Sequence, residues 1–398
     1  MNTKFRNHII YALSIVFFAL TFTGCNSKSV KTQNADNKQI DSQNKQYVIV
    51  GTFTSKTESK GIYVYEFSVD SGTLSLVSEI GEIDDPSYLT VHSNKKWIYA
   101  VSETKNPNGH VAAYRFDSLS GQLTLLNMVS TVGASPCNIR IDKSGKFVLV
   151  ANYTSGSVNV FPINADGTLD SCSFVDQHEG SGPYESRQES PHAHTVVMGN
   201  APLVYSTDLG SDQIVISKLD TSTGVLKSTK LSVKTTPGSG PRHIEFNKNK
   251  TRLYVSCELN GTVEAYNIDP ESGGLKRFQI ISTLPDTTSG YPATADIHLT
   301  PSEKFLYVSN RSNKNNIAIF KVDASNGELK AVGYQSCLGD MPRNFVIDPS
   351  GKFLLVANQK SDNVFVFRIN ETTGTLQQIG KETRIPGPAC LKFYNYPD

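Results

Sequence analysis

Two short segments carry histidine and arginine side chains suited to acid–base or anion-binding chemistry. His192 and His194 flank an alanine, and Arg242 is followed directly by His243. Residues two apart in a strand project from the same side, so the two histidines are expected to face the same way. Such a pair could supply a general base or a substrate ligand. The alternative is two hydrogen-bonded histidines without a chemical role.

Glu258 and Arg311 follow two apolar strand-like runs, and Arg343 precedes another. A carboxylate and a guanidinium near the mouth of a channel must be paired or solvated, and they could bind an anionic substrate. Arg242 is expected to line solvent there. Asn and Asp residues that end similar runs are expected to cap turns. The sequence has no Walker loop, Rossmann fingerprint, HExxH or GxSxG motif, so no cofactor and no metal are expected.

These residues belong to a repeat of about 50 residues that runs through the chain. A short apolar run ending in a polar residue occurs seven times, starting at residues 47, 97, 147, 203, 253, 305 and 353. Each copy is followed by a second run, a Gly-x-Leu hairpin signal, and a segment that mostly begins near proline. Four strands per repeat without helical periodicity predict an all-β fold, a seven-bladed β-propeller of four-stranded antiparallel blades. A tandem of two β-sandwiches is the alternative.

The ends of the repeat predict how the ring closes. The first copy lacks a proline-led segment before it, and the last such segment, Pro388 to Tyr394, has no copy after it. The C-terminal strand should therefore complete the first blade. The proline-led segments should be the inner strands, with their starts at one mouth of the channel. The longest spacing contains an insertion, Gln177 to Ser190, which is expected to be a binding loop.

The N-terminus is typical of an exported lipoprotein. Lys4 and Arg6 precede an apolar stretch that ends at Gly24-Cys25 and resembles a lipobox. We therefore expect a signal peptide at 1–24, lipidation of Cys25, a disordered tether over 25–46, and the propeller over 47–398. The membrane is then contacted through the lipid anchor alone. Asn26 favours sorting to the outer rather than the inner membrane of a Gram-negative host, on its periplasmic side.

Composition excludes other classes of function. A formal net charge of +1 over 398 residues does not suit a nucleic-acid binder. Beyond Cys25 the chain has five cysteines, without a CxxC pair, which argues against a zinc site and a full disulfide framework. Cys257 lies in an apolar run and is expected to be a small buried hydrophobe. A monomer is expected.

Several motifs together resemble the seven-bladed propeller lactonases, over Tyr47 to Asp398. They are Ser186 to Val196, Gly240-Pro241-Arg242-His243, Glu258-x-Asn260-Gly261, Tyr307-x-Ser309-Asn310-Arg311, Ala295-Asp296-Ile297-His298 and Pro342 to Gln359. That family includes 6-phosphogluconolactonases and, more distantly, fungal muconate lactonizing enzymes. The resemblance implies a catalytic set of His194, Glu258, Arg242 and Arg311. Its implied substrate-binding residues are His192, His243, Asn260, Asp296, Arg343 and Gln359.

The resemblance implies an enzyme, a carboxylic ester hydrolase that acts on an anionic or sugar lactone. His194 would be the base, with His192 next in order and Glu258 assisting. A protein exported through the Cys25 signal would not meet a phosphorylated lactone that is made in the cytoplasm, so the natural substrate stays open. Two other functions remain: a non-catalytic periplasmic propeller that binds a ligand or protein, and a lactonizing cycloisomerase.

Overall fold

The computed structural model describes residues 46–105, 109–285 and 291–395, all within one compact unit, Lys45–Asp398. The predicted signal peptide, the lipidation site Cys25 and the tether lie outside the described residues, apart from Gln46, the first residue of strand β1. The described residues form strands and no helix. Among them, therefore, no helix has the length and apolar content needed to cross a bilayer.

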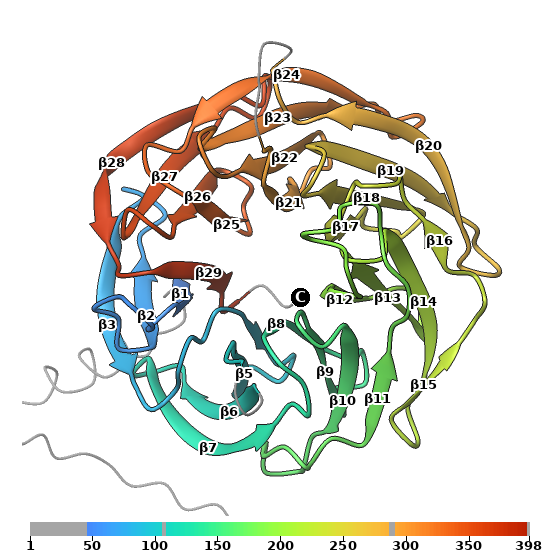
Figure 1. The fold of residues 1–398 in the computed structure, drawn as a ribbon. Coiled ribbons are helices and arrows are strands. Elements are labelled where there is room, and N and C mark those ends of the chain that lie inside the picture. The colour runs from blue at the N-terminus through green and yellow to red at the C-terminus, as the bar shows by residue number, and fades with distance from the viewer. Residues whose placement is uncertain (1–45, 106–108, 286–290, 396–398) are drawn as a thin grey trace, which may run out of the picture. The chain divides into compact units, whose positions relative to one another are not determined.

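The strands form seven antiparallel sheets arranged in a ring, which confirms the predicted propeller (Figure 1). The first three blades are β29 (Pro388–Phe393), β1 (Gln46–Thr52), β2 (Ile62–Phe67) and β3 (Leu74–Ile80); β4 (Leu89–Val91), β5 (Trp97–Ser102), β6 (His110–Asp117) and β7 (Gln122–Ser130); and β8 (Pro136–Ile141), β9 (Phe147–Asn152), β10 (Ser157–Pro162) and β11 (Phe174–Gln177). The fourth blade is β12 (Ala193–Met198), β13 (Leu203–Asp208), β14 (Gln213–Asp220) and β15 (Val225–Ser228), with the short β16 (Val233–Lys234) also paired to β14. The last three are β17 (Pro241–Phe246), β18 (Arg252–Cys257), β19 (Thr262–Ile268) and β20 (Leu275–Ser282); β21 (Thr294–Leu299), β22 (Phe305–Asn310), β23 (Asn316–Val322) and β24 (Leu329–Ser336); and β25 (Pro342–Ile347), β26 (Phe353–Asn358), β27 (Asn363–Ile369) and β28 (Leu376–Arg384).

Ring closure follows the prediction from the chain ends. The C-terminal strand β29 pairs with β1, with Leu391 opposite Val50 and Phe393 opposite Val48. The first blade is therefore built from both ends of the propeller, and β29 pairs with the edge of β1 that would otherwise be open.

Burial explains why the apolar runs read so clearly in the sequence. The second strand of each blade is covered on both faces by neighbouring blades, and all six residues of β26 are buried. Such strands are continuously apolar rather than alternating. The outermost strands, such as β28, bury few residues and are mostly polar.

Four of the hairpins between third and fourth strands also bond to the blade before them. The Tyr205 hydroxyl on β13 donates to the carbonyl of Gly273 in the fifth blade at 2.7 Å. Gly273 has φ of +79°, and a Cβ there would lie 2.2 Å from a methyl carbon of Leu203. The turn therefore requires glycine both for its backbone angle and for the close contact. Tyr99, Tyr254 and Tyr307 make the same bond to Gly167, Gly327 and Gly374.

Candidate functional site at one mouth of the central channel

β-Bulges at the start of six of the seven inner strands take residues out of the ladder to the second strand. Pairing of β17 with β18 skips from Pro241 to His243, so Arg242 is left out of the ladder. Equivalent shifts leave out His194 in β12 and Arg343 in β25. A bulge bends its strand and re-aims the extra side chain. The same place is held by Cys137 in β8, Ala295 in β21 and Ala389 in β29, and by Ser87 just before β4.

The residue directly after each second strand forms another set of equivalent positions. Its N–H bonds to a carbonyl at the start of the same blade, as Glu258 does to Gly240 at 2.8 Å and Arg311 to Ala293 at 3.2 Å. This places Glu258 beside the bulge that carries Arg242. The full set is Phe53, Glu103, Tyr153, Leu209, Glu258, Arg311 and Gln359. Two rings of repeat-equivalent residues therefore meet at one mouth.

Glu258 is held by three arginines. Its Oε2 accepts from Arg242 Nε at 3.0 Å and lies 2.6 Å from Arg311 Nη2. Its Oε1 accepts from Arg187 Nη2 at 2.7 Å and from the Tyr291 hydroxyl at 2.8 Å. Burial alone would raise the pKa of Glu258, but the three guanidinium groups hold it well below its usual range. The carboxylate is therefore ionised and has both oxygens engaged.

Arg187 and Tyr291 come from two connections that the sequence analysis did not single out as site residues. Arg187 lies in the insertion 177–190, and Tyr291 precedes β21. The Arg187 guanidinium lies 5.6 Å from the centre of the Tyr291 ring, bonds to its hydroxyl, and donates to the Tyr153 hydroxyl at 3.2 Å. The insertion thus reaches the channel mouth. Neither connection carries the repeat pattern, so only the chemistry of SRQES within the insertion could have drawn attention to Arg187.

Arg242 is 1% exposed, so the expectation that it lines solvent is wrong. Its Nη1 lies 3.1 Å from His243 Nε2, which must then accept, since a guanidinium only donates. Burial and the charges of Arg311 and Arg343 lower the pKa of Arg242 to about 10. Burying this cation is possible because Glu258 neutralises it and His243 accepts its second bond.

His243 and Asp296 continue the network down the channel. His243 Nδ1 lies 2.6 Å from Asp296 Oδ1, and Asp296 Oδ2 accepts from Asn344 at 2.5 Å and lies 3.2 Å from His298 Nε2. Burial and Arg242 lower the pKa of His243 to about 3, which leaves it neutral. Burial opposes protonation of His298, but the Asp296 and Glu245 carboxylates raise its pKa to about 10. Asp296 therefore sits beneath the arginine cluster and holds His243 in one tautomer.

His194 and His192 both pack against Tyr153. The His192 ring stacks on it at 4.5 Å and 8°, whereas His194 meets it edge-on at 5.7 Å. His192 precedes β12, and its Nε2 lies 3.2 Å from Glu189 Oε1, while His194 occupies the bulge. Burial and the charge of Arg242 hold the pKa of His194 well below 6.5. His194 is therefore neutral, and its buried Nδ1 has no partner among the described residues.

The remaining predicted residues lie apart from the Glu258 cluster. Arg343 reaches toward Glu103 Oε2 at 3.5 Å and lies over the Phe53 ring at 5.1 Å. Asn260 accepts from Thr262 at 2.8 Å within the β18–β19 turn. Gln359 follows β26, and its buried Oε1 has no partner in the described part of the chain.

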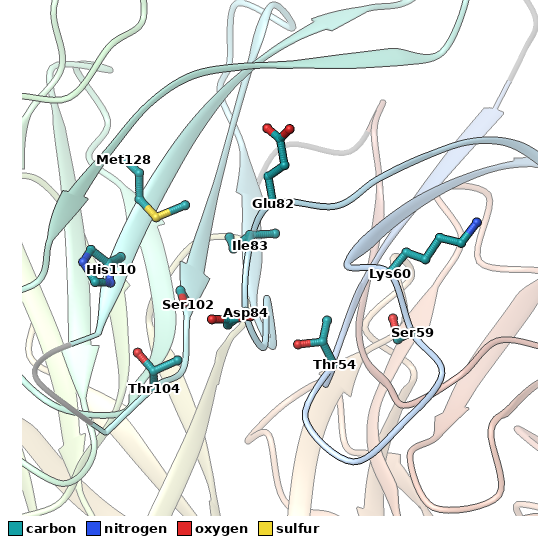
Figure 2. Close-up of a pocket in the computed structure, with 10 residues that line it drawn as sticks. All are labelled: Thr54, Ser59, Lys60, Glu82, Ile83, Asp84, Ser102, Thr104, His110 and Met128. Carbon is teal, nitrogen blue, oxygen red and sulfur yellow. The ribbon is translucent and has the colours of Figure 1, made fainter.

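Two hollows lie away from this cluster. One, of about 590 Å³, lies at the rim between the first and second blades, where Figure 2 shows Lys60, Glu82 and His110 around it. Another, of about 540 Å³, is lined by the ends of inner strands, including Arg140 and Lys392. In the described ranges no three His, Cys, Asp or Glu residues are grouped to hold a metal. Cys257 is fully buried, as predicted, and all five cysteines there are free thiols.

Comparison with known protein families agrees with the seven-bladed fold. The family model described as "Lactonase, 7-bladed beta-propeller" matches residues 47–393. The chain therefore belongs to this lactonase family, which confirms the predicted family and its enzyme class.

Individual relatives agree with this assignment. A 6-phosphogluconolactonase of Formosa agariphila is 38% identical over 354 residues, covering 88% of this chain and 99% of the relative. One from Bacillus subtilis is 38% identical, covering 86% and 97%. Among solved structures, the periplasmic gluconolactonase PpgL of Pseudomonas aeruginosa is 31% identical, with a TM-score of 0.84, and the match covers 88% of this chain and 99% of that one.

Proposed function

We propose that this protein hydrolyses an anionic or polyhydroxylated sugar lactone at the channel mouth around His194 and Arg242. One observation carries the proposal: three guanidinium groups converge on a single buried carboxylate, Glu258, beside a neutral histidine. Three positive charges against one negative charge leave two to attract a substrate anion or a developing oxyanion.

Each residue of the cluster then has a distinct task. His194 is neutral and can accept the proton of an attacking water. Arg187, whose side chain is 30% exposed, and Arg311 beside it would offer their remaining donors to a phosphate, carboxylate or oxyanion. Glu258 is a poor base, because both its oxygens are engaged and its pKa is far below the usual range. We therefore assign Glu258 to positioning the arginines, in place of the assisting-base role expected from the sequence.

The predicted substrate-binding residues also separate into proposed substrate contacts and positioning residues. His192 and Arg343 lie at the mouth and remain proposed substrate contacts. Asp296 is 1% exposed and bonded to His243, His298 and Asn344, which supports a positioning role for it and for His243. Asn260 and Gln359 remain candidates on the strength of the family resemblance alone.

Location bears on the choice of substrate. The predicted lipobox at Cys25 and the similarity to a periplasmic gluconolactonase support a lipoprotein on the periplasmic side of a bacterial membrane. A non-phosphorylated aldonolactone would be the substrate available there. The names of the 38% identical relatives favour 6-phosphogluconolactone instead. The positive mouth accommodates both.

The decisive experiment compares hydrolysis of glucono-δ-lactone and 6-phosphoglucono-δ-lactone by the purified protein, with the spontaneous rate subtracted. We expect turnover of at least one, and a loss of about 10²–10⁴-fold in kcat/KM for His194→Gln. As a matched control, His110→Gln removes an imidazole from the rim hollow and should leave the rate unchanged. Wild-type rates equal to background on both lactones would refute the proposal and favour a binding propeller.

A further inference from the structure

A second carboxylate, Glu103, occupies the position in the second blade that Glu258 holds in the fifth. Each directly follows the second strand of its blade, and each N–H bonds to a carbonyl at the start of that blade. Their surroundings differ. Glu258 has three arginines and a tyrosine on its two oxygens, whereas Glu103 is contacted on one oxygen only.

Only one of the two carboxyl oxygens of Glu103 is contacted by other side chains. Its Oε2 accepts a short hydrogen bond from the Ser87 hydroxyl, and Arg343 Nη2 approaches the same oxygen at 3.5 Å. Both partners are donors, so a proton on this carboxyl group must reside on Oε1. Within the described part of the chain, Oε1 has no partner, and the side chain is 16% exposed. The group is thus oriented by Ser87 and open at its free oxygen.

Glu103 lies on the side of Cys137 opposite to His194. The bulge positions run in the order Ser87, Cys137, His194 around the second, third and fourth blades. Cys137 Sγ donates to the His194 carbonyl at 3.4 Å. Burial raises the pKa of the Cys137 thiol. The Cys137 thiol is therefore neutral, and in the order of the blades it lies between His194 and Glu103.

Given the proposed lactone hydrolysis, we infer that Glu103 is its general acid. Water attacks the lactone carbonyl carbon and gives one proton to His194, and the carbonyl oxygen becomes an oxyanion beside the arginines. The tetrahedral intermediate then breaks its bond between that carbon and the ring oxygen. Glu103 Oε1 gives its proton to the departing ring oxygen, which becomes a hydroxyl group. The product acid transfers its proton to water, and the proton on His194 passes through solvent to restore Glu103.

The pKa shifts of Glu103 and His194 agree with the roles of acid and base. Burial raises the pKa of Glu103, and Asp85 raises it further, while Arg343, Ser87 and Arg242 oppose the shift. The pKa of His194 moves in the opposite direction. Opposite shifts of this kind favour an unprotonated base and a protonated acid, which is the pair that hydrolysis requires. The charged and titratable groups facing Glu103 are Arg343 on β25, Arg242 on β17, Cys137 on β8, and Asp85 before β4.

The first test is the pH profile of kcat/KM for Glu103→Gln in the full-length protein with glucono-δ-lactone. Wild type should show a bell: activity rises as His194 loses its proton and falls as Glu103 loses its own, above pH 4.5. The glutamine keeps the shape and the Ser87 bond. It should lower kcat/KM by about 10²–10⁴-fold and remove the falling limb. Glu82→Gln, which removes an exposed carboxylate from the hollow between the first and second blades (Figure 2), should preserve both the rate and the bell-shaped profile.

The second test varies the leaving group. Dihydrocoumarin releases a phenol, whose pKa of about 10 makes protonation of the departing oxygen less important than for an aliphatic alcohol. The defect of Glu103→Gln should therefore shrink by roughly tenfold or more on this lactone. An equal defect on both lactones, or a variant that keeps the falling limb, would overturn the general-acid role. If wild type hydrolyses neither of these lactones nor 6-phosphoglucono-δ-lactone, the proposed function fails and this role fails with it.

Discussion

Arg242→Lys is the substitution whose consequences the structure defines most sharply. Lysine keeps the charge but offers one ammonium in place of a planar fork. The arginine spans two buried partners, Glu258 Oε2 at 3.0 Å and His243 Nε2 at 3.1 Å. Lysine would retain one of these contacts at best, because its single nitrogen cannot occupy both directions.

The expected cost follows from the contact that is lost. A hydrogen bond to a charged group contributes about 1.5–3 kcal/mol. That corresponds to a loss of very roughly ten- to a hundredfold in kcat/KM if the transition state depends on the arginine. Because Arg242 is 1% exposed, the folded state should also lose stability, contrary to what a solvent-lining residue would show. We therefore expect both the melting temperature and kcat/KM to fall.

Both quantities should be measured on one preparation, with kcat/KM normalised to the folded fraction. Arg343→Lys is the matched control, because that guanidinium makes one long polar contact of 3.5 Å, lies over the Phe53 ring and is 17% exposed, so the melting temperature of this variant should change less. If Arg242→Lys loses stability while kcat/KM per folded molecule is unchanged, Arg242 is a purely structural residue. If neither the melting temperature nor kcat/KM changes, the argument that residue 242 must donate to both Glu258 and His243 is refuted.

Further substitutions test the rest of the network. Glu258→Gln leaves three guanidinium groups without their anion, so the melting temperature should fall in thermal denaturation more than for any single arginine variant. Arg187→Ala should raise KM for a phosphorylated lactone about tenfold with a smaller change in kcat in steady-state assays, because the 30% exposed guanidinium faces the mouth. The raised pKa of His298 stabilises the fold fully below pH 6.5, and this contribution is lost as pH rises through about 10. The deficit in melting temperature of His298→Gln should therefore be largest below pH 6.5 and shrink toward pH 10; a pH-independent deficit would contradict the ion pair.

The repeat was predictable because burial on both faces makes every second strand an apolar run. Seven such runs and their spacing were sufficient for blade number, strand order and ring closure. The sequence was less informative about register at the mouth. It groups Glu103 and Glu258 with Asn152 and Asn358 as polar residues that end a strand. In the structure those asparagines are the last residues of their strands, whereas the two glutamates lie one position further on.

That offset decides what each residue can do. Asn358, the last residue of β26, is fully buried and donates to the Cys337 carbonyl at 3.0 Å, a structural task. The next position faces the channel mouth, and there the sequence places Tyr153 after Asn152 as well as the two glutamates. The bulges themselves lie in the inner strands, and the residue types there do not reveal them. Arg187 and Tyr291 could not be predicted from the sequence for another reason. They lie in irregular connections, which have no equivalent in the other repeats for comparison.

Small residues among the equivalent positions explain how long side chains can converge at this mouth. Arg343 in the seventh blade extends past the first blade to Glu103 in the second, and the bulge position between them is Ala389. Likewise Arg311 and Arg242 meet at Glu258, where the sixth blade contributes Ala295. A seven-fold repeat with a large residue at every bulge would fill the mouth with side chains. The departures from the repeat, in both size and charge, therefore set the space and the charge of the proposed site together.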